Sequence, residues 1–207
     1  MKSLRVLFSV AFLSLASSTG TMAAEQTAVF AGGCFWGVEA VFEHVKGVKD
    51  VKSGYAGGTK ETANYDEVSN GSTKHAEVVE IVFDDAAVTY EQLLYIFFAV
   101  VHDPSEIDRQ GPDIGPQYRS AIFYMDDKQK RAAEAFVLSI NTSKVFNKPV
   151  ATQITKFETF YQAEQYHQDY LKKNPENTYI VQHDMPKLAD LKKKFPELWK
   201  DKYGLVK

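Results

Sequence analysis

The chain has 207 residues, of which 24 are Lys or Arg and 27 are Asp or Glu, and its formal net charge at pH 7 is −3. This mildly acidic balance gives no electrostatic basis for binding nucleic acid, which calls for a basic surface. The single cysteine, Cys34, excludes an internal disulfide.

The first 23 residues predict a secretory signal peptide. Residues 1–5 form a short basic segment, residues 6–16 are apolar, and Thr21 and Ala23 place small residues at positions −3 and −1 of a cleavage site. The apolar run is too short to span a bilayer comfortably, which argues against an uncleaved membrane anchor. We therefore expect one mature domain over residues 24–207, exported to the periplasm and free of the membrane once the signal is removed.

The surroundings of Cys34 indicate a reactive thiol. Residues 26–30 are β-branched and aromatic, which predicts a strand, and the apolar residues after the cysteine recur at helical spacing. Gly32 and Gly33 turn the backbone between the strand and the helix. Because a helix N-terminus presents unpaired N–H groups and a positive dipole end, we expect a stabilised thiolate. The alternative is a buried cysteine that serves only as a small hydrophobe.

The remaining chain alternates between strand and helix patterns. The predicted strands are residues 48–56, 75–83, 119–124 and 150–157. The predicted helices are residues 90–101, 126–143, 163–173 and 187–194, with residues 178–182 short and extended, and residues 60–72 and 102–118 as loops. Up to residue 124 the order is β-α-β-β-α-β, which is the ferredoxin-like order. We expect an α/β (α+β) two-layer sandwich with this core and a mixed sheet.

Turnover at Cys34 requires an acid or a base, and Glu77 is the most suggestive candidate. If Val79, Ile81 and Phe83 face the core, Glu77 lies on the same side of its strand. Burial there raises the pKa of the carboxyl, so that it can donate a proton near neutral pH. With the other strand parity Glu77 faces solvent, and the pattern alone leaves both possibilities open. The other candidates are His75, His102, Asp103, Asp113, Tyr65 and Tyr118.

Motifs for several other chemistries are missing from the sequence. The five histidines are scattered and there is no second cysteine, so we expect no metal site. No G-x-S-x-G, G-x-G-x-x-G or P-loop motif occurs. A Cys/His/Asn hydrolase arrangement stays open on composition, although its usual local signature is absent.

Six segments together resemble the motifs of one family. They are residues 33–37 (GCFWG), 54–58 (GYAGG), 64–68 (NYDEV), 75–79 (HAEVV), 102–104 (HDP) and 109–120 (RQGPDIGPQYRS). In this order they resemble peptide methionine sulfoxide reductases of the A type, from about residue 26 to at least residue 171. The resemblance implies a ferredoxin-like two-layer fold. It also implies an oxidoreductase for the S epimer of methionine sulfoxide, free or in oxidised proteins, which repairs oxidative damage.

The resemblance also implies how the reaction is catalysed. Cys34 is the nucleophile and becomes a sulfenic acid, and Glu77 is the proton donor. Many relatives carry further cysteines near the C-terminus that resolve the sulfenic acid, whereas this chain has none. It therefore resembles the single-cysteine form, which has no bound cofactor and depends on an external thiol reductant. That reductant is a thioredoxin-like protein, a glutaredoxin or a small thiol.

The substrate-binding residues implied by the resemblance lie in the same motifs. Tyr65 and Tyr118 bind the sulfoxide oxygen, Phe35 and Trp36 surround the S-methyl group, and Asp113 helps to place the substrate.

One departure from the family pattern lies beside the proposed acid. Lys74 stands where relatives usually have glycine, and a cation near Glu77 favours the charged carboxylate. We therefore expect Lys74 to point outward.

Two other functions are alternatives to the reductase. One is a different cysteine-dependent enzyme, a peroxidase or a hydrolase. The other is a non-catalytic module that binds methionine sulfoxide. For the reductase we expect a monomer.

Overall fold

The computed structural model describes residues 24–206, so the predicted signal peptide lies outside the described residues. Within residues 24–206, no helix is long and apolar enough to cross a membrane.

A six-stranded sheet forms the centre of the domain, with strand order β7-β6-β1-β3-β2-β8. The strands are β1 (Glu25–Gly32), β2 (Val48–Ala56), β3 (Ala76–Asp84), β6 (Ser120–Tyr124), β7 (Gln153–Lys156) and β8 (Phe160–Gln162). The central four strands pair antiparallel in the order β6-β1-β3-β2, which is the ferredoxin-like arrangement. β7 pairs parallel with β6 and β8 pairs antiparallel with β2, so the sheet is mixed. The predicted fold class is confirmed.

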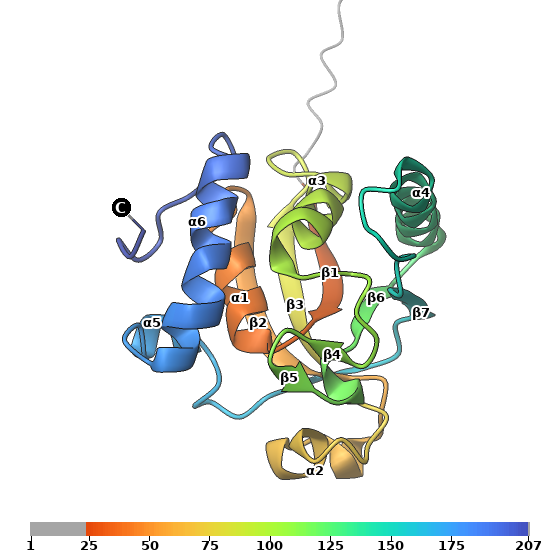
Figure 1. The fold of residues 1–207 in the computed structure, drawn as a ribbon, viewed down its shortest axis with the longest axis vertical. Helices are drawn as coiled ribbons and strands as arrows, with labels where there is room; N and C mark the ends of the chain where they lie inside the picture. The colour runs from red at the N-terminus through yellow and green to blue at the C-terminus, as the bar shows by residue number, and fades with distance from the viewer. Residues whose placement is uncertain (1–23, 207) are drawn as a thin grey trace, which may run out of the picture.

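Helices cover one face of this sheet (Figure 1). The longer ones are α1 (Phe35–Glu43), α3 (Tyr90–Ile96), α4 (Asp127–Ser143) and α6 (Met185–Lys194), and the short helix α5 (Tyr170–Lys173) packs beside α1. The short helix α2 (Tyr65–Ser69) lies beyond one end of the sheet, at the bottom of the view. α1 packs on β2 and β3 and is flanked by α6, and the apolar core lies between these helices and the sheet. Val79, Ile81 and Phe83 of β3 belong to that core.

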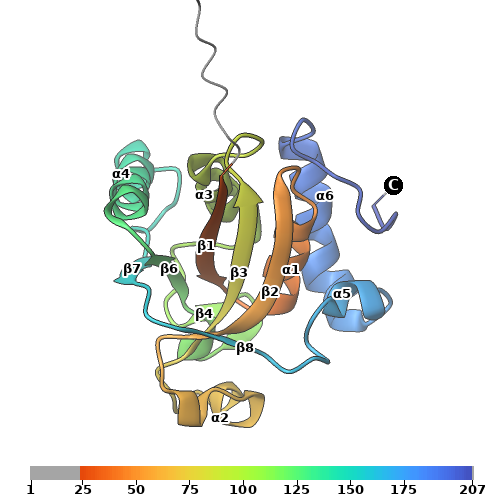
Figure 2. The same ribbon diagram turned by 180° about the vertical axis from the view of Figure 1, so that it is seen from behind.

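The other face of the sheet carries a second, smaller apolar cluster. Its buried members include Val29, Val78 and Phe123, with Phe157 and Phe160 packed against them. Residues 157–159 join β7 at one edge of the sheet to β8 at the opposite edge, and the chain crosses this face there (Figure 2). Both faces of the sheet are therefore covered near the end where β1 leads into α1.

The last third of the chain departs most from the sequence prediction. Residues 165–169 form turns, and only Tyr170–Lys173 of the predicted helix is helical. The Gln168 side chain bonds to both the N–H and the C=O of Ser53, which holds the segment against β2 instead of in a helix. Residues 178–182, expected to be extended, are helical and continue through a π-helical turn, η4 (Ile180–Asp184), into α6. Ile180 is fully buried there, so packing overrides the strand preference of its neighbours.

The long predicted loop 102–118 also contains structure that the sequence pattern did not indicate. β4 (Arg109–Gln110) and β5 (Asp113–Ile114) pair as a two-stranded hairpin. A 3-10 turn, η3 (Pro116–Tyr118), then leads into β6. Such short strands carry no periodicity, so only the pairing reveals them.

Candidate active site

Cys34 occupies the N-cap position of α1, directly after β1. Gly33 has a φ of +97°, and a Cβ atom there would lie 2.8 Å from the side chain of Gln110. Only glycine meets both conditions, so the turn that presents Cys34 requires it. The cysteine is free and 9% exposed.

A cavity of about 160 Å³ opens at this turn. It is lined by Cys34, Phe35, Trp36, Tyr65, Glu77, Asp113, Tyr118 and Tyr179. The structure thus brings together all seven of the predicted site residues, from five separate segments of the chain, and adds one tyrosine.

Glu77 lies on the core side of β3. It is 2% exposed, and its register places it with Val79 and Ile81 on the helix-covered face, which resolves the strand parity. The backbone N–H of Phe35, in the first turn of α1, donates to Glu77 Oε2 at 3.0 Å. Burial raises the pKa of this carboxyl to about 8, although the bond from Phe35 opposes the rise. Glu77 is therefore mostly neutral at pH 7.

The thiol of Cys34 is surrounded by acids instead of cations. Burial raises its pKa well above the ordinary value, and Glu77, Asp184 and Asp113 raise it further. A hydrogen bond from the backbone N–H of Trp36 lowers it. The expected stabilisation of the thiolate is therefore wrong for the free protein, because desolvation and nearby carboxyls outweigh the helix end. Cys34 rests as a neutral thiol beside a neutral acid.

Tyr65 and Tyr118 present two phenol groups to the cavity. Burial, followed by the nearby Glu77, raises the pKa of both side chains. Both therefore keep their O–H protons and can act as hydrogen-bond donors.

Asp113 is held by a residue that the sequence did not indicate. The Tyr179 O–H donates to Asp113 Oδ2, and the Tyr179 ring meets the Trp36 ring edge-on at 6.0 Å. Tyr179 belongs to residues 178–182, for which the sequence predicts an extended segment and where no motif marks it. Its helical placement brings it to the cavity.

Trp36 forms one wall of the cavity and is fixed from two sides. Its ring stacks on Tyr170 at 3.6 Å with an interplanar angle of 6°. Its Nε1–H donates to Nδ1 of His167 at 3.0 Å. His167 and Tyr170 both follow β8, in the region where the sequence predicted one continuous helix.

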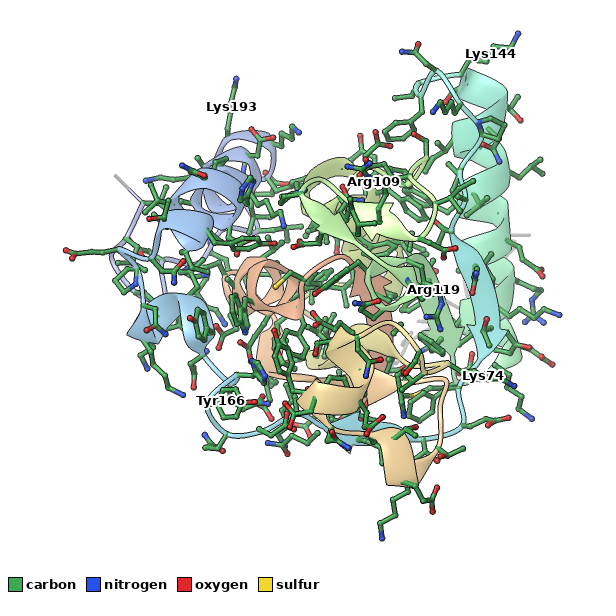
Figure 3. All side chains as sticks on the ribbon, turned by 60° about the horizontal axis from the view of Figure 1, so that its bottom comes forward. Lys74, Arg109, Arg119, Lys144, Tyr166 and Lys193 are labelled. Carbon is green, nitrogen blue, oxygen red and sulfur yellow. The ribbon has the colours of Figure 1, made fainter. Side chains whose placement is uncertain are left out.

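The other sequence candidates lie outside the cavity. His75 bonds to the Thr59 carbonyl, and His102 lies between the Phe97 carbonyl and the Ser120 hydroxyl. Asp103 caps the nearby turn by accepting from Ser105. Lys74 is exposed at the edge of the molecule, as predicted (Figure 3). Over residues 24–206, no group of three or more His, Cys, Asp or Glu side chains could hold a metal ion.

The sequence matches the model of the family described as peptide methionine sulfoxide reductase over residues 26–199. The chain belongs to this family. The match covers every residue of the cavity and, apart from Glu25, the whole sheet. The predicted family is therefore confirmed.

Relatives and solved structures of methionine sulfoxide reductases agree with this membership. The chain is 52% identical over 177 residues to peptide methionine sulfoxide reductase MsrA 2 of Synechocystis, covering 86% of this chain and 81% of that protein. It is 51% identical over 181 residues to MsrA 2 of Mesorhizobium japonicum, covering 87% and 93%. Reduced Mxr1 of Saccharomyces cerevisiae is similar in fold, with a TM-score of 0.67, 32% identity, and 74% and 87% coverage. Methionine sulfoxide reductase A of Corynebacterium diphtheriae is also similar in fold, with a TM-score of 0.65 and 32% identity, covering 75% of this chain and 77% of that chain.

Proposed function

We propose that this member of the peptide methionine sulfoxide reductase family reduces the S epimer of methionine sulfoxide, free or in proteins, to methionine. The observation that supports it most directly is the pairing of a neutral Glu77 with Cys34 in one cavity. The Phe35 N–H that binds Glu77 belongs to the residue next to the cysteine, so acid and nucleophile share one rigid turn.

The first step needs a proton on the sulfoxide oxygen, because only then is the sulfur electrophilic. Glu77 donates this proton, and the hydroxyls of Tyr65 and Tyr118 donate hydrogen bonds to the same oxygen. The sulfur of Cys34 attacks the substrate sulfur, and the thiol proton returns to the Glu77 carboxylate. The hydroxyl group then passes from the substrate sulfur to the Cys34 sulfur, so that the substrate S–O bond and the transient S–S bond break as the Cys34 S–O bond forms. Methionine leaves reduced by two electrons, and Cys34 is left as a sulfenic acid, oxidised by two electrons.

The same cavity selects the epimer. Phe35 and Trp36 form an apolar wall for the S-methyl group, while Glu77 and the tyrosines hold the oxygen. With the methyl group and the oxygen fixed, the third substituent on sulfur, which is the rest of the substrate, must extend out through the cavity mouth. Only one configuration at sulfur satisfies all three conditions. Asp113, held by Tyr179, helps to place the substrate.

The sulfenic acid is reduced by an external thiol, since the chain holds no second cysteine. One thiol condenses with Cys34 to form a mixed disulfide and water, and a second thiol releases Cys34 and the oxidised reductant. A thioredoxin-like protein, a glutaredoxin or a small thiol can supply both. No bound cofactor takes part in this cycle.

A limiting-enzyme experiment tests the proposal. Without added thiol, the enzyme should convert one equivalent of (S)-methyl p-tolyl sulfoxide per Cys34 and leave the R enantiomer untouched. Dimedone should then label Cys34 as a sulfenic acid. C34S, which keeps the shape of the side chain, is the matched control and should form no product. Conversion of the R enantiomer, or of many equivalents without thiol, contradicts the proposal.

The acidic surroundings of Cys34 argue against a cysteine peroxidase. Such an enzyme relies on a thiolate, whereas burial and, after it, Glu77, Asp184 and Asp113 all raise the pKa of this thiol. An intact Cys34 and Glu77 likewise argue against a module that only binds the sulfoxide.

We further propose that residues 1–23 are a cleaved signal peptide and that residues 24–207 act as a periplasmic monomer in the repair of oxidised proteins. The support is the basic and apolar pattern of residues 1–16. N-terminal sequencing of the protein from a periplasmic extract should begin at residue 24. A start at Met1, or recovery with the membrane fraction, contradicts this.

A further inference from the structure

The wall of the cavity is bonded to a histidine 131 positions away in the sequence. The Nε1–H of Trp36 donates to Nδ1 of His167 at 3.0 Å, and His167 is 1% exposed. An indole N–H can only donate, so Nδ1 must be the unprotonated nitrogen and the neutral ring carries its proton on Nε2. Trp36 thus selects one tautomer of His167, and His167 orients the ring of Trp36.

His167 also packs against the side of the cavity that binds oxygen. Its ring lies 4.5 Å from the Tyr65 ring and 4.9 Å from the Phe35 ring, measured between centroids. On its outer side the Tyr166 ring lies 4.2 Å away, in the segment between β8 and α5 (Figure 3). One buried imidazole therefore separates the methyl wall from a phenol donor.

Glu164 extends this support to the backbone. Its Oε1 accepts from the backbone N–H of Tyr65 at 2.9 Å, and its Oε2 accepts from the Tyr55 hydroxyl at 2.9 Å. Nε2 of His167 lies 4.0 Å from the same Oε2, and the His167 backbone N–H bonds to the Glu164 carbonyl at 2.9 Å. Burial opposes ionisation of Glu164, but the bonds from Tyr65 and Tyr55 outweigh it and bring the pKa of this carboxyl below its ordinary value. Glu164 is therefore ionised.

We propose that Glu164 and His167 are positioning residues that hold Trp36 and Tyr65 at a set separation across the cavity and thereby determine which sulfoxide substituents fit. This inference rests on the proposed function, in which Trp36 faces the S-methyl group and Tyr65 faces the oxygen. Neither Glu164 nor His167 lines the cavity, so each acts through its neighbours.

The proposal predicts a change in substituent selectivity that a loss of stability alone does not produce. When the Trp36 ring loses its acceptor, the methyl pocket loosens, so the ethyl homologue of methyl p-tolyl sulfoxide becomes a relatively better substrate. One methylene more or less in an apolar pocket changes selectivity by about 10- to 200-fold, which sets the size of the methyl-over-ethyl preference that the variants can lose.

Three variants separate the hydrogen bond from simple packing. His167→Phe keeps an aromatic ring but removes the acceptor. His167→Asn restores an oxygen close to the position of Nδ1. Glu164→Gln keeps the shape of the carboxylate but presents an N–H group to one of its two donors. The matched control is His44→Phe, because His44 is also fully buried and stacks on a tryptophan, Trp199, away from the cavity.

For His167→Phe we expect KM for methyl p-tolyl sulfoxide to rise about tenfold with kcat within about threefold. Leaving a buried donor unpaired has a cost of this size, and methyl binding is similar in the ground and transition states. The methyl-to-ethyl ratio of kcat/KM should fall at least about threefold. His167→Asn should recover most of both effects. Glu164→Gln should lower kcat about fivefold, because the Tyr65 hydroxyl acts on the oxygen in the transition state. His44→Phe should lower Tm and change neither KM nor the ratio.

Trp36 fluorescence provides a readout independent of activity. In a Trp199→Phe background, which leaves one tryptophan in the described chain, His167→Phe should shift the emission maximum and His167→Asn should restore it. An unchanged methyl-to-ethyl ratio and emission maximum in His167→Phe, with wild-type enzyme active, overturns the positioning role alone. An inactive wild-type enzyme overturns the proposed function itself.

Discussion

Glu77 and Glu39 are two buried glutamates that differ in what they face. Both are 2% exposed, and burial raises the pKa of both to about 8. Glu77 faces a free thiol and three phenols across the active-site cavity. Glu39 lies on α1 and faces a second cavity of about 210 Å³, whose lining is mostly polar and includes Glu43 and Lys202.

The comparison shows that a raised pKa does not by itself mark a catalytic acid. Beside Glu39, the carboxylate of Glu43 is bonded to Lys202 and to the Tyr203 hydroxyl, and these bonds hold the C-terminal segment onto α1. Glu43 is the second cause of the raised pKa of Glu39, after burial. A proton on Glu39 therefore relieves repulsion within a structural cluster, whereas in the proposed reaction the proton on Glu77 is transferred to the substrate.

The largest expected difference between the two carboxyls is in turnover. E77Q should lower kcat on methyl p-tolyl sulfoxide by about 10² or more, which is the usual contribution of a positioned proton donor. E39Q, the matched change, should leave kcat within about threefold. Steady-state kinetics at pH 7 with excess dithiothreitol measures both, and equal losses in the two variants contradict the distinction.

The pH dependence of activity should report Glu77. Its neutral form is needed, and that form is lost as pH rises through about 8. For wild type, kcat/KM should be level up to about pH 7, reach about half of its maximum near pH 8, and fall about tenfold per pH unit above about pH 9. The residual activity of E77Q should lack this limb, because an amide does not titrate. A limb that persists near pH 8 in E77Q assigns the titration to another group.

The pH dependence of stability should report Glu39. A carboxyl whose pKa is raised on folding contributes stability that is fully present below its unfolded pKa, near 4.5, and lost as pH rises through about 8. E39Q does not titrate, so its stability should fall less than that of wild type between pH 5 and pH 9. One pKa unit corresponds to about 1.4 kcal/mol. The difference in the free energy of unfolding between wild type and E39Q, measured by urea unfolding, should therefore change by more than that amount between pH 5 and pH 9. A difference that stays constant with pH contradicts the raised pKa of Glu39.

The smallest expected effect concerns the anchor of the C-terminal segment. Y203F removes the hydroxyl that donates to Glu43 and to Asp169, and should lower the free energy of unfolding by about 1 kcal/mol. KM and kcat should not change, because Tyr203 lies outside the active-site cavity. Y179F offers the contrasting case, since the lost bond to Asp113 should raise KM. Similar kinetic losses in both variants contradict this separation.

Residues 25–84 follow their sequence patterns closely. β1, α1, β2 and β3 begin and end within a few residues of the predicted positions, because alternation and helical spacing reflect which side of each element is buried. The segment after β8 does not, since Gln168 is drawn to Ser53 and Ile180 to the core by partners far away in the sequence. His167 and Tyr179 could not be found as site residues for the same reason.

The sequence by itself determined the strand–glycine–helix turn around Cys34, the ferredoxin-like order of elements and the family. Each of these depends on neighbours in the chain, whose side chains set the local backbone and the motif spacing. Tertiary structure decided the parity of Glu77, the neutral state of the Cys34 thiol and the support of Trp36 by His167. These depend on desolvation and on contacts between segments as much as 131 residues apart, which no local pattern records.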